Sequence, residues 1–286
     1  MDNDIRYIQE LGVEIQTNTP VKDLGEIFNQ GYKAIFLGIG CQESMKLRIP
    51  NEEAKGVIYA LDFLRLVNSG VKISLGGRVA VVIGGGSVAI DAARVSLRLG
   101  AKEVHLVCLE SRDLSSKDRM LAQDREIAEA EDEGLIIHPC LGPKQILTKE
   151  AKVVGLKTII CTSVRDASGR FAPRFAEGPA PTIEADTIIV ATGQRPSEVI
   201  FKEIEKGPIQ TIKVDPTTLH TNVEGVFAGG DVVSGPADVI AVITAGKQAA
   251  ISIDRYLRGV DLKEGRPEVS CFLGNQCPRI LLYIPG

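Results

Sequence analysis

The feature that most constrains the fold is the segment 79–91, where an apolar run ends at three consecutive glycines and then resumes with helical spacing. Residues 79–83 are typical of a buried strand, and residues 88–99 place their apolar side chains along one helical stripe. A buried strand that turns sharply into a helix through Gly-x-Gly-x-x-Ala is an arrangement that binds a dinucleotide pyrophosphate. The segment therefore predicts a dinucleotide-binding domain of the α/β class.

Each small residue of this turn has an expected role. Gly84 permits the tight turn, Gly86 lets the backbone approach the diphosphate, and Ala89 allows close packing of helix on strand. Backbone N–H groups at the start of the helix would then face the diphosphate, assisted by the helix dipole. The expected contacts are Gly84, Gly85, Gly86, Ser87, Val88 and Ala89.

The next expected strand, 103–110, ends in an acidic residue about 20 residues beyond the turn, the usual distance for a ribose ligand. A carboxylate at Glu110 would accept hydrogen bonds from the ribose hydroxyls and repel a 2′-phosphate, which favours NAD over NADP. NADP stays open as the alternative, because Arg112, or Lys117 and Arg119 beyond it, could reach such a phosphate. Ser111 and Arg112 complete the expected adenosine end of the site.

Strand and helix patterns alternate through most of the chain, which predicts a parallel sheet. The Gly76-Gly77 pair is the expected crossing point between domains, and the segment 166–181 is expected to be an exposed loop or hairpin tip. The other expected strands are 13–15, 33–40, 135–138, 153–162 and 187–191, and the other expected helices are 24–29, 57–69, 117–133 and 237–257.

Composition narrows the class of partner. The formal net charge is −4 and no stretch concentrates the Lys and Arg residues, which argues against a nucleic-acid partner. No apolar run approaches the roughly 20 residues needed to span a bilayer, and residues 1–10 lack the pattern of a signal peptide. We therefore expect a cytoplasmic protein with neither a membrane nor a nucleic-acid partner.

Cysteine and histidine patterns suggest neither a thiol redox centre nor a metal. The six cysteines form no Cys-x-x-Cys pair, and only Cys271 and Cys277 come near one, so we expect incidental thiols. His105 falls inside an expected strand, where packing is the simpler explanation. His138 and His220 are isolated, with no spacing typical of a metal site.

Three later segments carry a family resemblance. Residues 187–196 resemble the ATG motif that closes the NAD(P) domain of two-dinucleotide-binding flavoproteins, and residues 225–231 resemble their Gly-Asp motif. Residues 235–250 resemble the helix that follows, and residues 7–19 and 34–40 resemble the middle of the FAD domain. As a set, these segments are most similar to the glutamate synthase small-subunit group of the pyridine nucleotide-disulfide oxidoreductases.

The resemblance implies two Rossmann-like, three-layer domains, with an NAD(P) domain at 76–196 inserted between FAD-domain parts at 1–75 and 197–286. Asp231 would contact the ribityl-phosphate part of FAD, and the start of the helix after it would face the flavin ring. The site residues implied in this way are Gly38, Gly40, Ala191, Thr192, Gly193, Gly230, Asp231, Ala237 and Val239.

Two departures from the family pattern matter. Leu109 and Glu110 stand where the family commonly has two arginines for the NADP phosphate, which strengthens the NAD assignment. The family also begins with an FAD-binding Gly-x-Gly-x-x-Gly strand, and no such strand precedes Met1 in this sequence. The expectation is therefore a shortened FAD domain with an incomplete grip on the flavin.

The expected function is an FAD-dependent oxidoreductase that passes hydride from NAD(P)H to flavin and electrons to a partner redox subunit, or within a homo-oligomer. No catalytic acid or base is assigned, because hydride transfer is the chemistry of the cofactors themselves. The alternative is a non-catalytic NAD(H)-binding module whose flavin site is incomplete.

Overall fold

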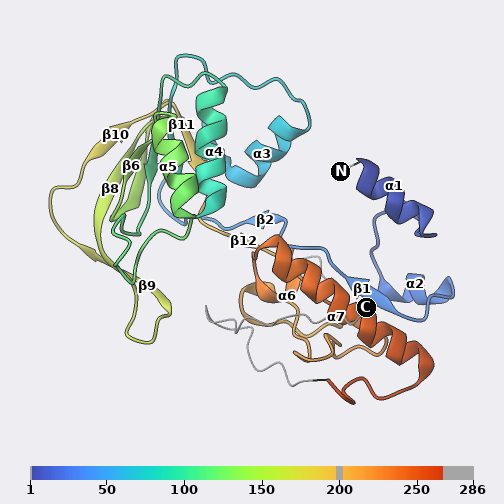
Figure 1. Ribbon diagram of the computed structural model, residues 1–286. Helices are drawn as coiled ribbons and strands as arrows, with labels where there is room; N and C mark the ends of the chain where they lie inside the picture. The colour runs from blue at the N-terminus through green and yellow to red at the C-terminus, as the bar shows by residue number, and fades with distance from the viewer. Residues whose placement is uncertain (1, 198–201, 267–286) are drawn as a thin grey trace. The chain divides into compact units, whose positions relative to one another are not determined.

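The computed structural model describes residues 2–197 and 202–266, which divide into two compact units (Figure 1). The inserted unit is Cys41–Pro196, and the split unit joins Met1–Gly40 to Ser197–Gly286. The first break falls after Gly40 and not at residue 75, because residues 57–68 belong to the sheet and helix layer of the inserted unit. Cys271 and Cys277 lie outside the described residues.

A five-stranded parallel sheet forms the centre of the inserted unit. Its central strands are apolar and buried on both faces, as is typical of a parallel sheet covered on both sides. The prediction of an α/β fold with a parallel sheet is confirmed. In spatial order the strands are β3 (Val57–Tyr59), β11 (Thr187–Val190), β4 (Val79–Ile83), β5 (Glu103–Val107) and β6 (Ile136–His138).

Helices cover one face of this sheet. Phe63 of α3 (Ala60–Asn68), Ile90 of α4 (Ser87–Arg98) and Ile127 of α5 (Asp124–Asp132) are buried in one cluster with Val82 and Leu106 of the sheet. The expected helix 57–69 begins later than predicted, because Val57–Tyr59 pairs with β11 as a strand. The expected helix 117–133 is likewise shorter, and only α5 forms.

An antiparallel sheet forms the layer on the other face, where Ile146, Leu156 and Ile183 pack against Val81 and Ile188. The sequence predicted a strand at 153–162 and a hairpin tip or exposed loop at 166–181. The strand forms and is longer, residues 152–165, and it makes a hairpin with residues 171–176, so these residues complete the third layer. The strands are β7 (Leu141–Lys149), β8 (Lys152–Arg165), β9 (Phe171–Ala176) and β10 (Thr182–Glu184).

The split unit contains a short parallel pair, β1 (Ile35–Leu37) and β13 (Val226–Ala228). Its core joins Leu24, Leu37, Ile212 and Val232. The expected strand at 13–15 does not form, and its side chains are exposed. The other elements of this unit are α1 (Asp2–Glu10), α2 (Leu24–Asn29), a 3-10 turn (Pro208–Gln210), α6 (Asp231–Ser234) and α7 (Val239–Arg258).

Two short strands lie where the chain enters and leaves the inserted unit. β2 (Glu43–Ser44) pairs antiparallel with β12 (Gln194–Arg195), and Arg195 forms an ion pair of 3.1 Å with Glu43. The entry and exit of this unit are therefore hydrogen-bonded to each other. No helix among the described residues is long and apolar enough to cross a bilayer.

Candidate functional site

The glycine turn lies at the point where the strand order of the parallel sheet reverses. From β4 the chain runs outward to β5 and β6, and then returns to the opposite side of β4 as β11. In open α/β sheets ligands bind outside the carboxyl ends of the strands at such a reversal. The turn that follows β4 and the segment that follows β11 therefore share the edge where a nucleotide would bind.

Gly84 is fixed at this edge by its backbone and by its neighbours. Its φ is +142°, and an added Cβ would collide with the carbonyl oxygen of Ala191. Its N–H donates to the carbonyl oxygen of Val107 at 2.9 Å. Two predicted site residues, Gly84 and Ala191, are thus in direct contact.

Gly85 and Gly86 serve different purposes. A Cβ at Gly85 would lie 2.5 Å from Oε2 of Glu110, so glycine is needed there for the carboxylate to approach. A Cβ at Gly86 would meet nothing within 4 Å, and Gly86 begins α4 without a side-chain cap. An uncapped helix N-terminus that opens onto free space fits a diphosphate.

The remaining residues of the turn support this helix start. Ala89 is buried in the core beneath α4, as the pattern predicted, while Val88 is partly exposed. The hydroxyl of Ser87 donates to Glu126 at 2.7 Å, and Glu126 forms the capping box of α5. Sequence reasoning missed Glu126, because 39 residues separate it from Ser87.

Glu110 lies at the expected adenosine end. Its carboxylate is partly buried against Gly85, and this burial raises its pKa. Arg112, the cation expected to compete for a phosphate, instead forms an ion pair of 2.8 Å with Glu131. The carbonyl oxygen of Ser111 accepts a hydrogen bond from the N–H of Met120 at 3.0 Å.

The segment after β11 is held by the residues next to β2. The N–H of Met45 donates to the carbonyl oxygen of Gly193 at 3.0 Å. The hydroxyl of Thr192 donates to the carbonyl oxygen of Met45 at 3.4 Å. Gly193 has a φ of +121°, a conformation that favours glycine. Ala191, Thr192 and Gly193 therefore form an ordered edge beside Gly84.

In the split unit, the predicted FAD residues also follow parallel strands. Gly38 and Gly40 come after β1, and Gly230 comes after β13, so they lie at the same edge of the pair. The ring of Phe36 lies there too, 3.1 Å from where a Cβ of Gly38 would be and 3.1 Å from that of Gly229.

Asp231 shapes the start of the long helix. Its Oδ1 accepts a hydrogen bond from the N–H of Ala237 at 3.2 Å. Asp238 caps α7 by accepting from the N–H of Ala241 at 2.8 Å, and the side chain of Val239 is exposed. A flavin held by this unit would meet a glycine-rich edge and a capped helix start.

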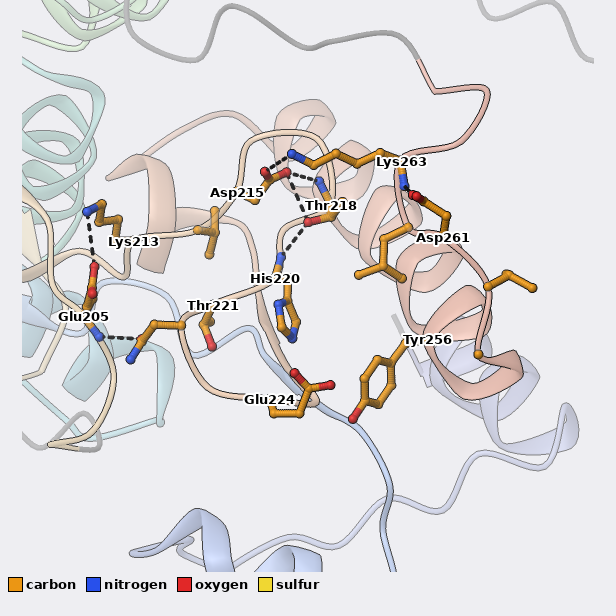
Figure 2. Close-up of a pocket in the computed structure, with 15 residues that line it drawn as sticks. Glu205, Lys213, Asp215, Thr218, His220, Thr221, Glu224, Tyr256, Asp261 and Lys263 are labelled. Atoms are coloured by element: carbon orange, nitrogen blue, oxygen red, sulfur yellow. Dashed lines mark hydrogen bonds and ion pairs between the residues drawn. The ribbon is translucent and has the colours of Figure 1, made fainter.

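A separate cavity of about 840 Å³ lies in the split unit, and sequence reasoning missed it. Figure 2 shows two ion pairs in its lining: Lys213 pairs with Glu205 at 3.1 Å, and Lys263 pairs with Asp215 at 2.6 Å. The Nε2 atom of His220 is buried there without a hydrogen-bond partner. The one glycine of the lining, Gly259, ends α7, so the lining offers a dinucleotide no glycine turn between a strand and a helix start.

The sequence predicted that His138 is isolated, but in the structure it lies next to His105. Nδ1 of His105 lies 3.0 Å from Nε2 of His138 on the neighbouring strand β6. Burial lowers the pKa of His138. Among the described residues, no group of three or more His, Cys, Asp or Glu side chains could hold a metal ion.

Comparisons with known proteins agree with this architecture. Residues 2–250 match the sequence family described as pyridine nucleotide-disulphide oxidoreductase. The beta subunit of NADP(+)-dependent formate dehydrogenase from Moorella thermoacetica is 37% identical over 262 residues, which cover 89% of this chain and 36% of that protein. The small chain of NADPH glutamate synthase from Escherichia coli K12 is 32% identical over 268 residues, covering 86% and 56%.

Among solved structures, Mycobacterium tuberculosis FprA in complex with NADPH has a TM-score of 0.65 at 21% identity, covering 82% of this chain and 65% of that one. At this identity the likeness shows the fold alone. The chain spans 36% and 56% of the length of the two curated relatives named above.

Proposed function

Because the chain belongs to the pyridine nucleotide-disulphide oxidoreductase family, we propose that it takes hydride from a reduced nicotinamide dinucleotide onto FAD and passes the electrons to a partner redox subunit. The observation that carries this proposal is the open glycine turn at the strand-order reversal, with Ala191 packed beside it. The partner subunit is supported by the names of the relatives, which are a beta subunit and a small chain.

In this proposal, the residues of the chain bind and orient the nicotinamide dinucleotide and FAD. The N-terminus of α4 would take the diphosphate at Gly86, Glu110 would accept from the ribose hydroxyls, and the edge at 191–193 would line the approach to the nicotinamide end. The residues that would hold FAD are Gly38, Gly40, Gly230, Asp231, Ala237 and Val239. FAD, when bound, supplies the hydride acceptor, so the chain itself needs no acid or base.

NADH is the donor that we propose for this chain. A carboxylate beside Gly85 would repel a 2′-phosphate, and the nearby Arg112 is engaged with Glu131. The curated relatives are named for NADP or NADPH, which supports the opposite preference. The side chain of Glu110 is the local feature that weighs against it.

The second candidate is a binding module for NAD(H) without catalysis. It is favoured by the contrast between the two units: among the described residues, the parallel sheet of the inserted unit has five strands and that of the split unit has two. A full dinucleotide site in one unit would then accompany a weaker one in the other.

Calorimetric titration with NADH, NADPH and FAD, followed by dye reduction in the presence of FAD, separates these candidates. The proposed function predicts binding of NADH and FAD, with faster dye reduction by NADH than by NADPH. Binding of NADH without FAD would support the module. Faster turnover with NADPH would reject the NADH preference.

A further inference from the structure

One face of the antiparallel sheet lies beside the predicted adenosine end. The N–H of Cys140 donates to the carbonyl oxygen of Glu110 at 3.0 Å, and the N–H of Leu141 donates to the carbonyl oxygen of Cys108 at 2.9 Å. The residues at the start of β7 are therefore hydrogen-bonded to the segment that follows β5. The inserted antiparallel layer is tied directly to the residues that would meet the ribose.

Strand register places one aromatic side chain on this face. Cys161 of β8 pairs with Phe175 of β9, and the N–H of Cys161 donates to the carbonyl oxygen of Cys140 at 2.8 Å. Directly opposite residues of antiparallel strands place their side chains on the same face. Phe175 therefore shares a face with Cys161.

Packing around Gly142 shows where on this face the ring of Phe175 lies. A Cβ at Gly142 would lie 2.6 Å from Cε1 of Phe175 and 3.1 Å from Cδ2 of Leu109. The absence of a side chain at Gly142 thus lets the Phe175 ring lie next to Leu109, the residue before Glu110. Phe175 as a residue is 45% exposed, so part of its surface is accessible to a ligand.

The other Phe and Tyr side chains of the inserted unit are Tyr59, Phe63 and Phe171. Phe63 is buried in the helix layer, and the hydroxyl of Tyr59 donates to Glu52 at 2.9 Å. Phe171 lies opposite Arg165, towards the free end of the β8–β9 hairpin that Figure 1 shows. Phe175 is therefore the aromatic side chain next to the residues expected to hold the adenosine.

We propose that Phe175 stacks on the adenine base of the bound dinucleotide, with Leu109 as the apolar neighbour of the base. Adenine is bonded directly to the ribose that Glu110 would hold. The base must therefore lie close to this carboxylate, with only the ribose between them. Aromatic rings bind bases through their faces. The inference rests on the proposed function, because it requires a dinucleotide at the glycine turn.

Two substitutions at Phe175 separate stacking from packing. Phe175→Leu keeps an apolar cover over Gly142 but removes the aromatic face, and we expect the Kd for NADH to rise about tenfold. Phe175→Tyr keeps the face and should bind NADH as the unchanged protein does. Phe171→Ala, four residues away on the same strand, should leave the Kd unchanged.

ADP-ribose identifies the half of the dinucleotide that is affected, because it carries the adenine and lacks the nicotinamide. Calorimetry should give the same loss of affinity for ADP-ribose as for NADH in Phe175→Leu, with an unchanged midpoint of thermal unfolding. Equal NADH affinity in Phe175→Leu and the unchanged protein would overturn the stacking alone, as would a loss confined to NADH. Failure of the unchanged protein to bind NADH would overturn the proposed function and this inference together.

Discussion

Gly84 and Gly86 lie two residues apart in one turn, yet a methyl group would meet different surroundings at each. Gly84→Ala would strain a φ of +142° and collide with the carbonyl oxygen of Ala191, so we expect the free energy of unfolding to fall by about 2 kcal/mol or more. Gly86→Ala meets open space, so this free energy should change by less than about 0.5 kcal/mol. Urea unfolding measures both.

Binding of NADH completes this comparison. A methyl group at Gly86 would occupy the space through which a diphosphate approaches, so the Kd for NADH should rise at least about tenfold in a fully folded variant. Unaltered affinity in Gly86→Ala would show that the diphosphate lies elsewhere.

Glu110 provides the second prediction for a single residue. Glu110→Gln keeps the shape of the side chain against Gly85 but removes its charge. The repulsion of a 2′-phosphate should then disappear, so the ratio of the NADPH Kd to the NADH Kd should fall about tenfold. An unchanged ratio, measured by calorimetry, would mean that Glu110 does not face the adenosine ribose.

At the scale of elements, ion pairs join α4 to α5. Arg94 lies 2.6 Å from Glu133 and 3.2 Å from Glu129, and Arg98 lies 2.9 Å from Glu133. Hydrogen bonds from Arg94 and then Arg98 lower the pKa of Glu133 to about 2. Because the folded-state pKa lies below the ordinary 4.5, this contribution to stability is present above pH 4.5 and is lost as the pH falls towards 2.

Glu133→Gln tests the contribution of this ion pair. The variant should be less stable than the unchanged protein at pH 7, and the difference in the free energy of unfolding should shrink at pH 3. Urea unfolding at the two pH values measures it, with Glu103→Gln on β5 as a control without a contact to either arginine. A difference that stays constant with pH would contradict the assignment.

Local sequence predicts some elements of this fold and misses others for a physical reason. The strand, turn and helix at 79–98 are encoded by adjacent residues, so the pattern identified them. Val57–Tyr59 became a strand because it pairs with β11, more than 100 residues later, which no local period reveals. The segment 13–15 lacks such a pairing among the described residues and remains without a strand.

The candidate site divides in the same way. Gly84, Glu110 and Ala191 follow strand ends of the parallel sheet, where motif spacing is informative, and the structure brings them together around the turn. Glu126 and Phe175 reach the same region from α5 and from the antiparallel layer. Their positions depend on tertiary packing, so the sequence pattern alone could not identify them.

At the scale of the whole molecule, the inserted unit is a single continuous segment with its own two-sided core. We therefore expect residues 41–196, expressed alone, to fold cooperatively and to bind NADH as the full chain does. Circular dichroism during heating measures cooperative folding, and calorimetric titration measures NADH binding. A fragment that folds but binds no NADH would show that the split unit contributes to the site.

The pairing of β2 with β12 has a consequence for how the chain folds. The two segments of the split unit are separated in sequence by the whole inserted unit, which would make their meeting entropically costly if that unit were unfolded. Once the inserted unit has formed, the β2–β12 ladder holds its two ends side by side, and the effective loop becomes short. Loop-closure entropy grows with the logarithm of loop length, so early folding of this unit would spare the split unit about 2 kcal/mol. The order of folding is thereby biased: the middle of the chain first, and its two ends afterwards.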